Sequence, residues 1–210
     1  MNRRRAAFVA ASALVSGISL AGCGADSDSG SGGHGGHTPT STASSSPSGT
    51  RSAGAARQGD IAFAQGMIPH HKQAVEMADI ALKKPSASAD VRKLATAIRR
   101  AQDPEIKTMT RWLTSWGAPT AMPSSGGHAG HDMGGMMTPA EMASLKKANG
   151  RGFDRQWMTL MIKHHQGAVK MATDVKKTTR NPDVRTLANA IIKGQTAEIT
   201  TMRRLLDNAS

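Results

Sequence analysis

The sequence predicts an all-α protein, a four-helix bundle built from two repeated helical hairpins. Three observations predict this fold. Apolar residues recur at helical spacing in four segments, no segment shows convincing strand-like alternation, and the second half of the chain repeats the first at a nearly constant offset. The 210 residues are enough for one domain or two small ones.

The N-terminal residues are typical of an export signal. Arg3, Arg4 and Arg5 precede an apolar stretch, residues 6–20, that is too short to span a bilayer comfortably. The following Leu-Ala-Gly-Cys resembles a bacterial lipobox, in which the cysteine is lipidated. The chain has one cysteine, Cys23, at the position this signal requires. We therefore expect a lipoprotein signal peptide over residues 1–22 and a lipid-anchored, extracytoplasmic protein; the alternative is an ordinary signal peptide that contains a cysteine.

Residues 23–59 are predicted to be a disordered tether. Ser, Gly, Thr, Ala and Pro dominate the segment, and it has almost no large apolar residue with which to form a core. It also contains a His-x-x-His pair, His34 and His37. The folded bundle is expected over residues 60–208.

Residues 60–117 and 153–208 are two copies of one unit. Their first helices match at an offset of 94, as in Phe63 and Trp157, and their second helices at an offset of 93, as in Glu105 and Glu198. One residue has been lost in the connecting loop, where loops tolerate a deletion. Neither hairpin can bury its apolar face alone, so the two are expected to pack together.

The helices are justified by their apolar faces and their caps. Each of the first two helices has a largely apolar stripe on one face. The stripe of the first helix is Phe63, Met67, His70, Ala74, Met77 and Ala81, and that of the second is Val91, Leu94, Ile98, Met109 and Leu113. Pro85 ends the first helix, and Ser88 or Asp90 caps the second.

The second half carries equivalent signals. Thr138 to Glu141 form a capping box with proline at the first helical position. Asn149 to Gly152 interrupt the chain that follows, and Asn181 caps the final helix.

Paired histidines occupy the same place in both units, in the middle of the apolar face. They are His70, His71, His164 and His165. Adjacent helical residues lie about 100° apart, so the members of a pair cannot point in one direction. Both can nevertheless lie on a wide inward face.

Methionines lie one turn before each pair and two turns after it. They are Met67, Met77, Met161 and Met171. Imidazoles and thioethers together suit copper in either oxidation state better than magnesium or calcium. We therefore predict a metal site for copper or another transition metal. The alternative is a set of core histidines bonded to a backbone group or a carboxylate, with methionines filling gaps.

Polar residues of the second helices lie on the same stripes as core residues. They are Gln102, Glu105, Gln195 and Glu198. A buried carboxylate needs a partner, and the histidine pairs are the nearest candidates. The glutamates are expected to orient an imidazole or to bind the metal directly; a structural polar pair is the alternative. Asp60 and Asp154 are expected to cap their helices rather than to reach a histidine.

The segment that joins the units, residues 118–138, is rich in Gly, His and Met. Its candidate donors are His128, His131, Met133, Met136 and Met137. Such residues on a flexible, glycine-rich segment predict a metal-capture loop, weaker than a preformed core site because binding must order it. Low-complexity composition is the alternative.

The doubled Met-Ile-x-His-His motif, with the Gln, Glu and Met residues of the second helices, resembles the bacterial domain of unknown function 305 family. The resemblance covers residues 60–208. It implies a ferritin-like four-helix bundle that is usually exported, and some members are associated with copper binding and tolerance. The second unit departs from the first at Trp157 and Lys163, which replace Phe63 and Pro69. The two halves are therefore not expected to bind metal equally.

The composition excludes several kinds of cysteine-based site. A single cysteine excludes an intramolecular disulfide framework, a multi-cysteine zinc site and a cysteine-ligated iron–sulfur cluster. The net charge of +12 permits anionic partners but identifies none, and no nucleic acid is expected. We predict a membrane-anchored protein that sequesters or transfers copper. The alternatives are a ferritin-like metal-dependent oxidoreductase, which the lack of Glu-x-x-His at the histidine pairs disfavours, and a helical interaction module of the cell envelope.

Overall fold

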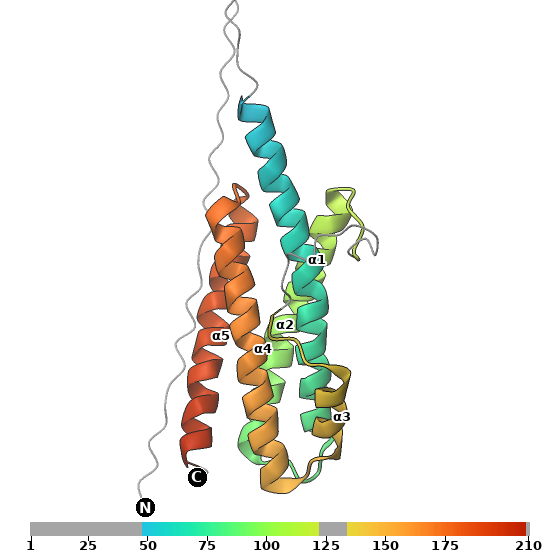
Figure 1. The fold of residues 1–210 in the computed structure, drawn as a ribbon, viewed down its shortest axis with the longest axis vertical. Coiled ribbons are helices and arrows are strands. Elements are labelled where there is room, and N and C mark those ends of the chain that lie inside the picture. The colour runs from blue at the N-terminus through green and yellow to red at the C-terminus, as the bar shows by residue number, and fades with distance from the viewer. Residues whose placement is uncertain (1–47, 122–133, 209–210) are drawn as a thin grey trace, which may run out of the picture. The chain divides into compact units, whose positions relative to one another are not determined.

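The computed structural model describes residues 48–121 and 134–208, which belong to one compact unit. The described chain forms helices α1 (Ser48–Lys83), α2 (Ala89–Ser115), α3 (Pro139–Lys147), α4 (Gly150–Thr178) and α5 (Pro182–Asn208) and contains no strand (Figure 1). The all-α prediction is thus confirmed. Within these ranges, no helix is long and apolar enough to cross a membrane. Cys23, His34 and His37 lie outside the described residues.

Helix α1 begins earlier than the sequence predicted. We placed the end of the tether at residue 59, but α1 starts at Ser48. Once the packed part of a helix has formed, each added residue gains a hydrogen bond at little nucleation cost, and Ala, Arg and Gln favour helix. The segment therefore continues the helix although it has too few apolar residues for a core of its own.

Two helical hairpins form the bundle. Helix α1 packs along α2, α4 packs along α5, and the hairpins meet mainly through α1 and α4, which run antiparallel (Figure 1). Two contacts define their register. The ring of His70 contacts that of His164. Two turns after His70 on α1 and two turns before His164 on α4, Trp157 Nε1 donates to the carbonyl oxygen of Met77 at 2.9 Å. Because position 70 corresponds to position 164 in the repeat, these histidines lie at the centre of an approximate two-fold arrangement.

Caps set most of the helix boundaries. Ser88 accepts a hydrogen bond from Val91 N, and Thr138 and Glu141 form the predicted reciprocal capping box. Asn181 Oδ1 accepts from the backbone N–H groups of Asp183 and Val184. The predicted interruption near residue 150 is the junction of α3 and α4, where Gly150 adopts a φ of 55°.

Candidate metal centre

A buried polar layer divides the apolar interior into two clusters. One cluster includes Met77, Ile98 and Trp157, and the other includes Phe63, Met109 and Ile191. Between them, each of the four long helices contributes two polar residues. We call these residues the histidine layer: His70, His71, Gln102, Glu105, His164, His165, Gln195 and Glu198. The repeat therefore brings the predicted histidines, glutamines and glutamates to one level of the bundle.

The four histidine side chains of this layer are fully buried. The ring centroids of His70 and His164 are only 3.8 Å apart, with an interplanar angle of 44°. This pair joins the two hairpins across the α1–α4 interface. His71 and His165 instead turn toward the second helix of their own hairpin.

Each of these outer histidines pairs with a glutamate. His71 Nε2 lies 2.8 Å from Glu105 Oε2, and His165 Nε2 lies 2.7 Å from Glu198 Oε2. The glutamate side chains are 19% and 20% exposed, so each carboxylate also reaches the edge of the bundle. An ionised carboxylate only accepts hydrogen bonds, so a neutral imidazole in either pair carries its proton on Nε2 and keeps the lone pair of Nδ1. The expected inward placement of both glutamates is confirmed.

Many polar atoms of the layer have no hydrogen-bond partner among the residues that the structure describes. They are His70 Nδ1, His71 Nδ1, His164 Nδ1 and Nε2, His165 Nδ1, Gln102 Nε2 and Oε1, and Gln195 Oε1. Buried polar groups are nearly always bonded, and an unmade bond costs about 1–3 kcal/mol. So many unpartnered atoms at one level of the core indicate a place for a ligand, an ion or ordered water.

Burial keeps the central imidazoles neutral. It lowers the pKa of His70 to about 4, assisted by the nearby His71, and it lowers the pKa of His164 well below the usual value, assisted by His70. A neutral ring offers a lone pair, whereas a protonated ring offers none. At neutral pH these two histidines are therefore in the state that a metal ion requires.

The layer does not form a ready-made cage of hard ligands. Across the described ranges, no three side chains of His, Cys, Asp or Glu are grouped so that they could hold a metal ion. A metal ion at this level must use fewer such ligands, recruit thioethers or shift the rings. This donor set differs from the oxygen cages of magnesium and calcium.

Two of the predicted methionines lie next to the layer. Met67 and Met161 are fully buried one turn before His70 and His164, and they fall in the two different apolar clusters. Because α1 and α4 are antiparallel, these two residues lie on opposite sides of the layer.

The other two methionines lie further away. Met77 and Met171 are two turns, about 10 Å of helix rise, beyond the histidines of their own helices. Met77 is buried in the cluster that contains Trp157. Met171 packs near Gly66, where an added Cβ would stand 3.0 Å from Met171 Cε. The structure does not bring either residue to the level of the histidines.

The two aspartates also lie away from the histidines. Asp60 is buried beside Thr179 at the end of α4, where burial raises the pKa of its carboxyl group. Asp154 accepts from the backbone N–H of Ser88 at 3.1 Å, so it supports the start of α2 and not that of its own helix. The prediction that each aspartate caps its own helix is therefore wrong: Asp60 lies within α1, which starts at Ser48, and Asp154 bonds to the start of α2.

Only part of the predicted capture loop is described. His128, His131 and Met133 lie outside the described residues. Met137 is buried in the apolar cluster around Trp157, and Met136 is partly buried. These two methionines belong to the packed part of the chain, which the glycine-rich composition did not indicate.

The sequence analysis missed three residues that hold the end of this segment against the layer. Gln73 on α1 forms two hydrogen bonds with the backbone of Met137, Gly134 O lies 3.4 Å from His70 Nε2, and Gly167 on α4 makes room for Gly134. One signal could have found Gln73 and Gly167. Position 73 corresponds to position 167 in the repeat, and it is one of the places within the motif where the two copies differ.

The fold and this layer define a class: an all-α bundle with a buried, duplicated histidine core and the chemistry to take a soft or borderline metal ion. The chain belongs to the DUF305 family, described as a domain of unknown function, whose model matches residues 60–206. No curated protein matches the chain.

Solved structures of similar sequence have the same architecture. A structure named CopM in the Cu(II)-bound form is 35% identical, with a TM-score of 0.60, and the match covers 72% of this chain and 97% of that one. A DUF305 protein of Streptomyces coelicolor that is assigned as secreted is 33% identical, with a TM-score of 0.67 and coverage of 72% and 93%. A DUF305 fragment of Deinococcus radiodurans is 36% identical, with a TM-score of 0.63 and coverage of 71% and 96%. CopM is also described in Cu(I)-bound and Ag-bound forms.

Proposed function

We propose that this protein binds copper as cargo at the histidine layer and that it sequesters or transfers the ion outside the cytoplasm. The observation that carries the proposal is the set of buried imidazole nitrogens that have no partner within the described chain and lie between two apolar clusters. The copper- and silver-bound forms of the similar CopM structures support it.

The proposed donors are the Nδ1 atoms of the layer. Glu105 and Glu198 hold the Nε2 protons of His71 and His165, which leaves Nδ1 of both rings available. His70 Nε2 faces the carbonyl of Gly134, which can only accept, so its Nδ1 is available as well. Neither nitrogen of His164 has a hydrogen-bond partner in the described part of the chain. In this proposal the glutamates orient imidazoles and are not themselves ligands.

The choice of copper follows from the neighbours of these rings. Thioether sulfur favours Cu(I), imidazole suits copper in general, and carboxylate cages favour harder ions. Met67 and Met161 place one thioether side chain within a turn of each central histidine. Met77 and Met171 pack two turns further along the bundle and are left out of the proposed donor set. Another transition metal that accepts imidazole remains the competing cargo in the test below.

The proposed location is the outer side of the cell membrane, with the chain anchored through lipid on Cys23. The lipobox-like residues at Cys23 and the assignment of a similar Streptomyces protein as secreted support this location. Imidazole and thioether donors fit it, because free thiols would oxidise there.

The test is a copper titration of the purified chain against a competing chelator, with zinc for comparison. Replacing all four layer histidines by Ala should abolish the tightest copper site, while His128→Ala with His131→Ala should leave it in place. His70→Gln with His164→Gln provides a second variant with smaller cavities, and circular dichroism checks that each variant is folded. Unchanged copper affinity in folded core variants would refute the proposal, as would stronger binding of zinc than of copper to the layer.

A further inference from the structure

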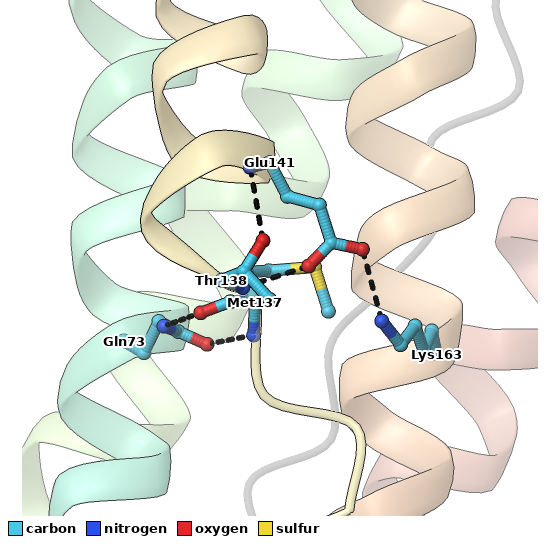
Figure 2. Close-up of polar contacts among 5 residues, drawn as sticks. All are labelled: Gln73, Met137, Thr138, Glu141 and Lys163. Carbon is cyan, nitrogen blue, oxygen red and sulfur yellow. Dashed lines mark hydrogen bonds and ion pairs between the residues drawn. The ribbon is translucent and has the colours of Figure 1, made fainter.

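Residues 134–137, here called the strap, cross from α4 to α1 at the level of the histidine layer. Gly134 and Gly135 pack against α4, where a Cβ added at Gly135 would stand 2.5 Å from Lys163 O. Gly135 also has a φ of 90°, which side-chain-bearing residues rarely adopt. The strap then reaches α1, where Gln73 Nε2 donates to Met137 O at 2.9 Å and Met137 N donates to Gln73 Oε1 at 2.6 Å (Figure 2).

The strap contacts the layer itself. Gly134 O is the one described hydrogen-bond partner of the His70 ring, at 3.4 Å from Nε2. A Cβ added at Gly167 would overlap Gly134 O and stand 3.0 Å from His70 Nε2. The absence of a side chain at position 167 therefore lets the strap lie against the ring.

The repeat shows that this arrangement belongs to one side of the bundle. At equivalent positions, α1 has Gln73, which holds the strap, and α4 has Gly167, which makes room for it. In the same way Lys163 replaces Pro69, and its Nζ pairs with Glu141 Oε1 at 2.9 Å, immediately beyond the strap (Figure 2). Glu141 also closes the capping box with Thr138. Two of the differences between the copies thus coincide with residues that hold the strap and the start of α3.

We infer that the strap closes one side of the histidine layer and positions the ring of His70, so that an ion exchanges through this side only when the strap lifts. The inference rests on the proposed copper site and adds the element that controls access to it. The strap holds the Nε2 proton of His70 and so leaves Nδ1 for the ion, the role that Glu105 has for His71. It also covers a site whose proposed ligands lie between two apolar clusters.

Gly167→Ala is the sharpest variant, because its methyl group displaces Gly134 from His70 and alanine favours the helix. Gly194→Ala is the matched control: it is also a glycine within a long helix, but an added Cβ there meets nothing within 4 Å. Gln73→Ala is an independent second variant that removes both hydrogen bonds to Met137 and leaves the core helices intact.

Two measurements test whether the strap controls exchange of the ion. Hydrogen exchange at the Met137 amide in the metal-free chain reports strap opening, and the rate of copper transfer to a chelator reports exchange of the ion. Both should rise by about tenfold or more in Gly167→Ala and Gln73→Ala, as expected for the loss of one or two hydrogen bonds, and remain unchanged in Gly194→Ala. Faster amide exchange with an unchanged transfer rate would overturn the inference alone. Failure of the unmodified chain to bind copper at the layer would overturn the proposed function and the inference with it.

Discussion

At the scale of single residues, the main feature is the pairing of a buried histidine with a glutamate from the neighbouring helix. The two pairs, His71–Glu105 and His165–Glu198, have nearly equal lengths of 2.8 and 2.7 Å although they come from different copies of the repeat. A hydrogen bond that fixes one nitrogen decides which nitrogen is left for a metal. We therefore regard the glutamates as positioning residues.

Replacing either glutamate tests this role. Glu105→Ala or Glu198→Ala should weaken copper binding by roughly 10- to 100-fold, because the released imidazole no longer presents Nδ1 in a fixed orientation. Glu105→Gln should retain most of the affinity, since its amide oxygen still accepts from Nε2. The affinities are measured by chelator competition. Equal losses in the Ala and Gln variants would show that the negative charge, and not the orientation of the ring, is what matters.

At the scale of helices, α1 and α4 form the central interface and α2 and α5 support it. The register of the central pair depends on few polar contacts. One is the hydrogen bond from Trp157 Nε1 to the carbonyl of Met77, which is fully buried. The equivalent residue of the first copy is Phe63, which cannot form such a bond. The first copy therefore has no counterpart of this hydrogen bond.

Trp157→Phe converts the second copy to the residue that the first copy already has. The variant should lower the free energy of unfolding by about 1–3 kcal/mol, through the lost buried hydrogen bond and the smaller ring. Chemical denaturation measures the change, and Trp112→Phe, at a partly buried position of α2, is the control. A loss no larger than that of the control would mean that the register does not depend on this bond.

At the scale of the whole molecule, the chain combines a nearly two-fold core with a connection that is not two-fold. The connection between the hairpins ends in the strap and in α3, which pack against one side of the core. The structure describes only part of the predicted metal-capture loop. Met136 and Met137 belong to the packed part, whereas the predicted donors His128, His131 and Met133 precede it.

Deleting residues 126–133 tests the predicted donors His128, His131 and Met133. The deletion spares the strap and the Thr138 capping box, so the unfolding midpoint and the tightest copper site should be retained. The number of copper ions bound at saturation should fall, because the predicted capture-loop donors are gone. Thermal unfolding and copper stoichiometry measure the two effects. Unchanged stoichiometry would show that these residues are compositional, and loss of the fold would show that the segment is structural.

Much of this architecture could be predicted from local patterns. The 3.6-residue periodicity, the repeat and the caps at Ser88, Thr138 and Asn181 indicated the helices and most of their boundaries, because these features depend on neighbours within one or two turns. The N-terminal extension of α1 was missed, since it has no core-forming stripe and depends on a helix that is already formed. The two histidine pairs and their glutamates stood out because two copies of the unit preserve them.

The sequence by itself therefore determined the helices, the duplicated hairpin and the residues of the polar layer. Only the tertiary structure decided that His70 meets His164, that Glu105 pairs with His71, that Asp154 supports another helix, and that Gly134 lies against His70. The physical reason is geometric. Adjacent histidines on a helix point about 100° apart, so periodicity allows either one to face a given neighbour, and the packing of distant segments makes the choice.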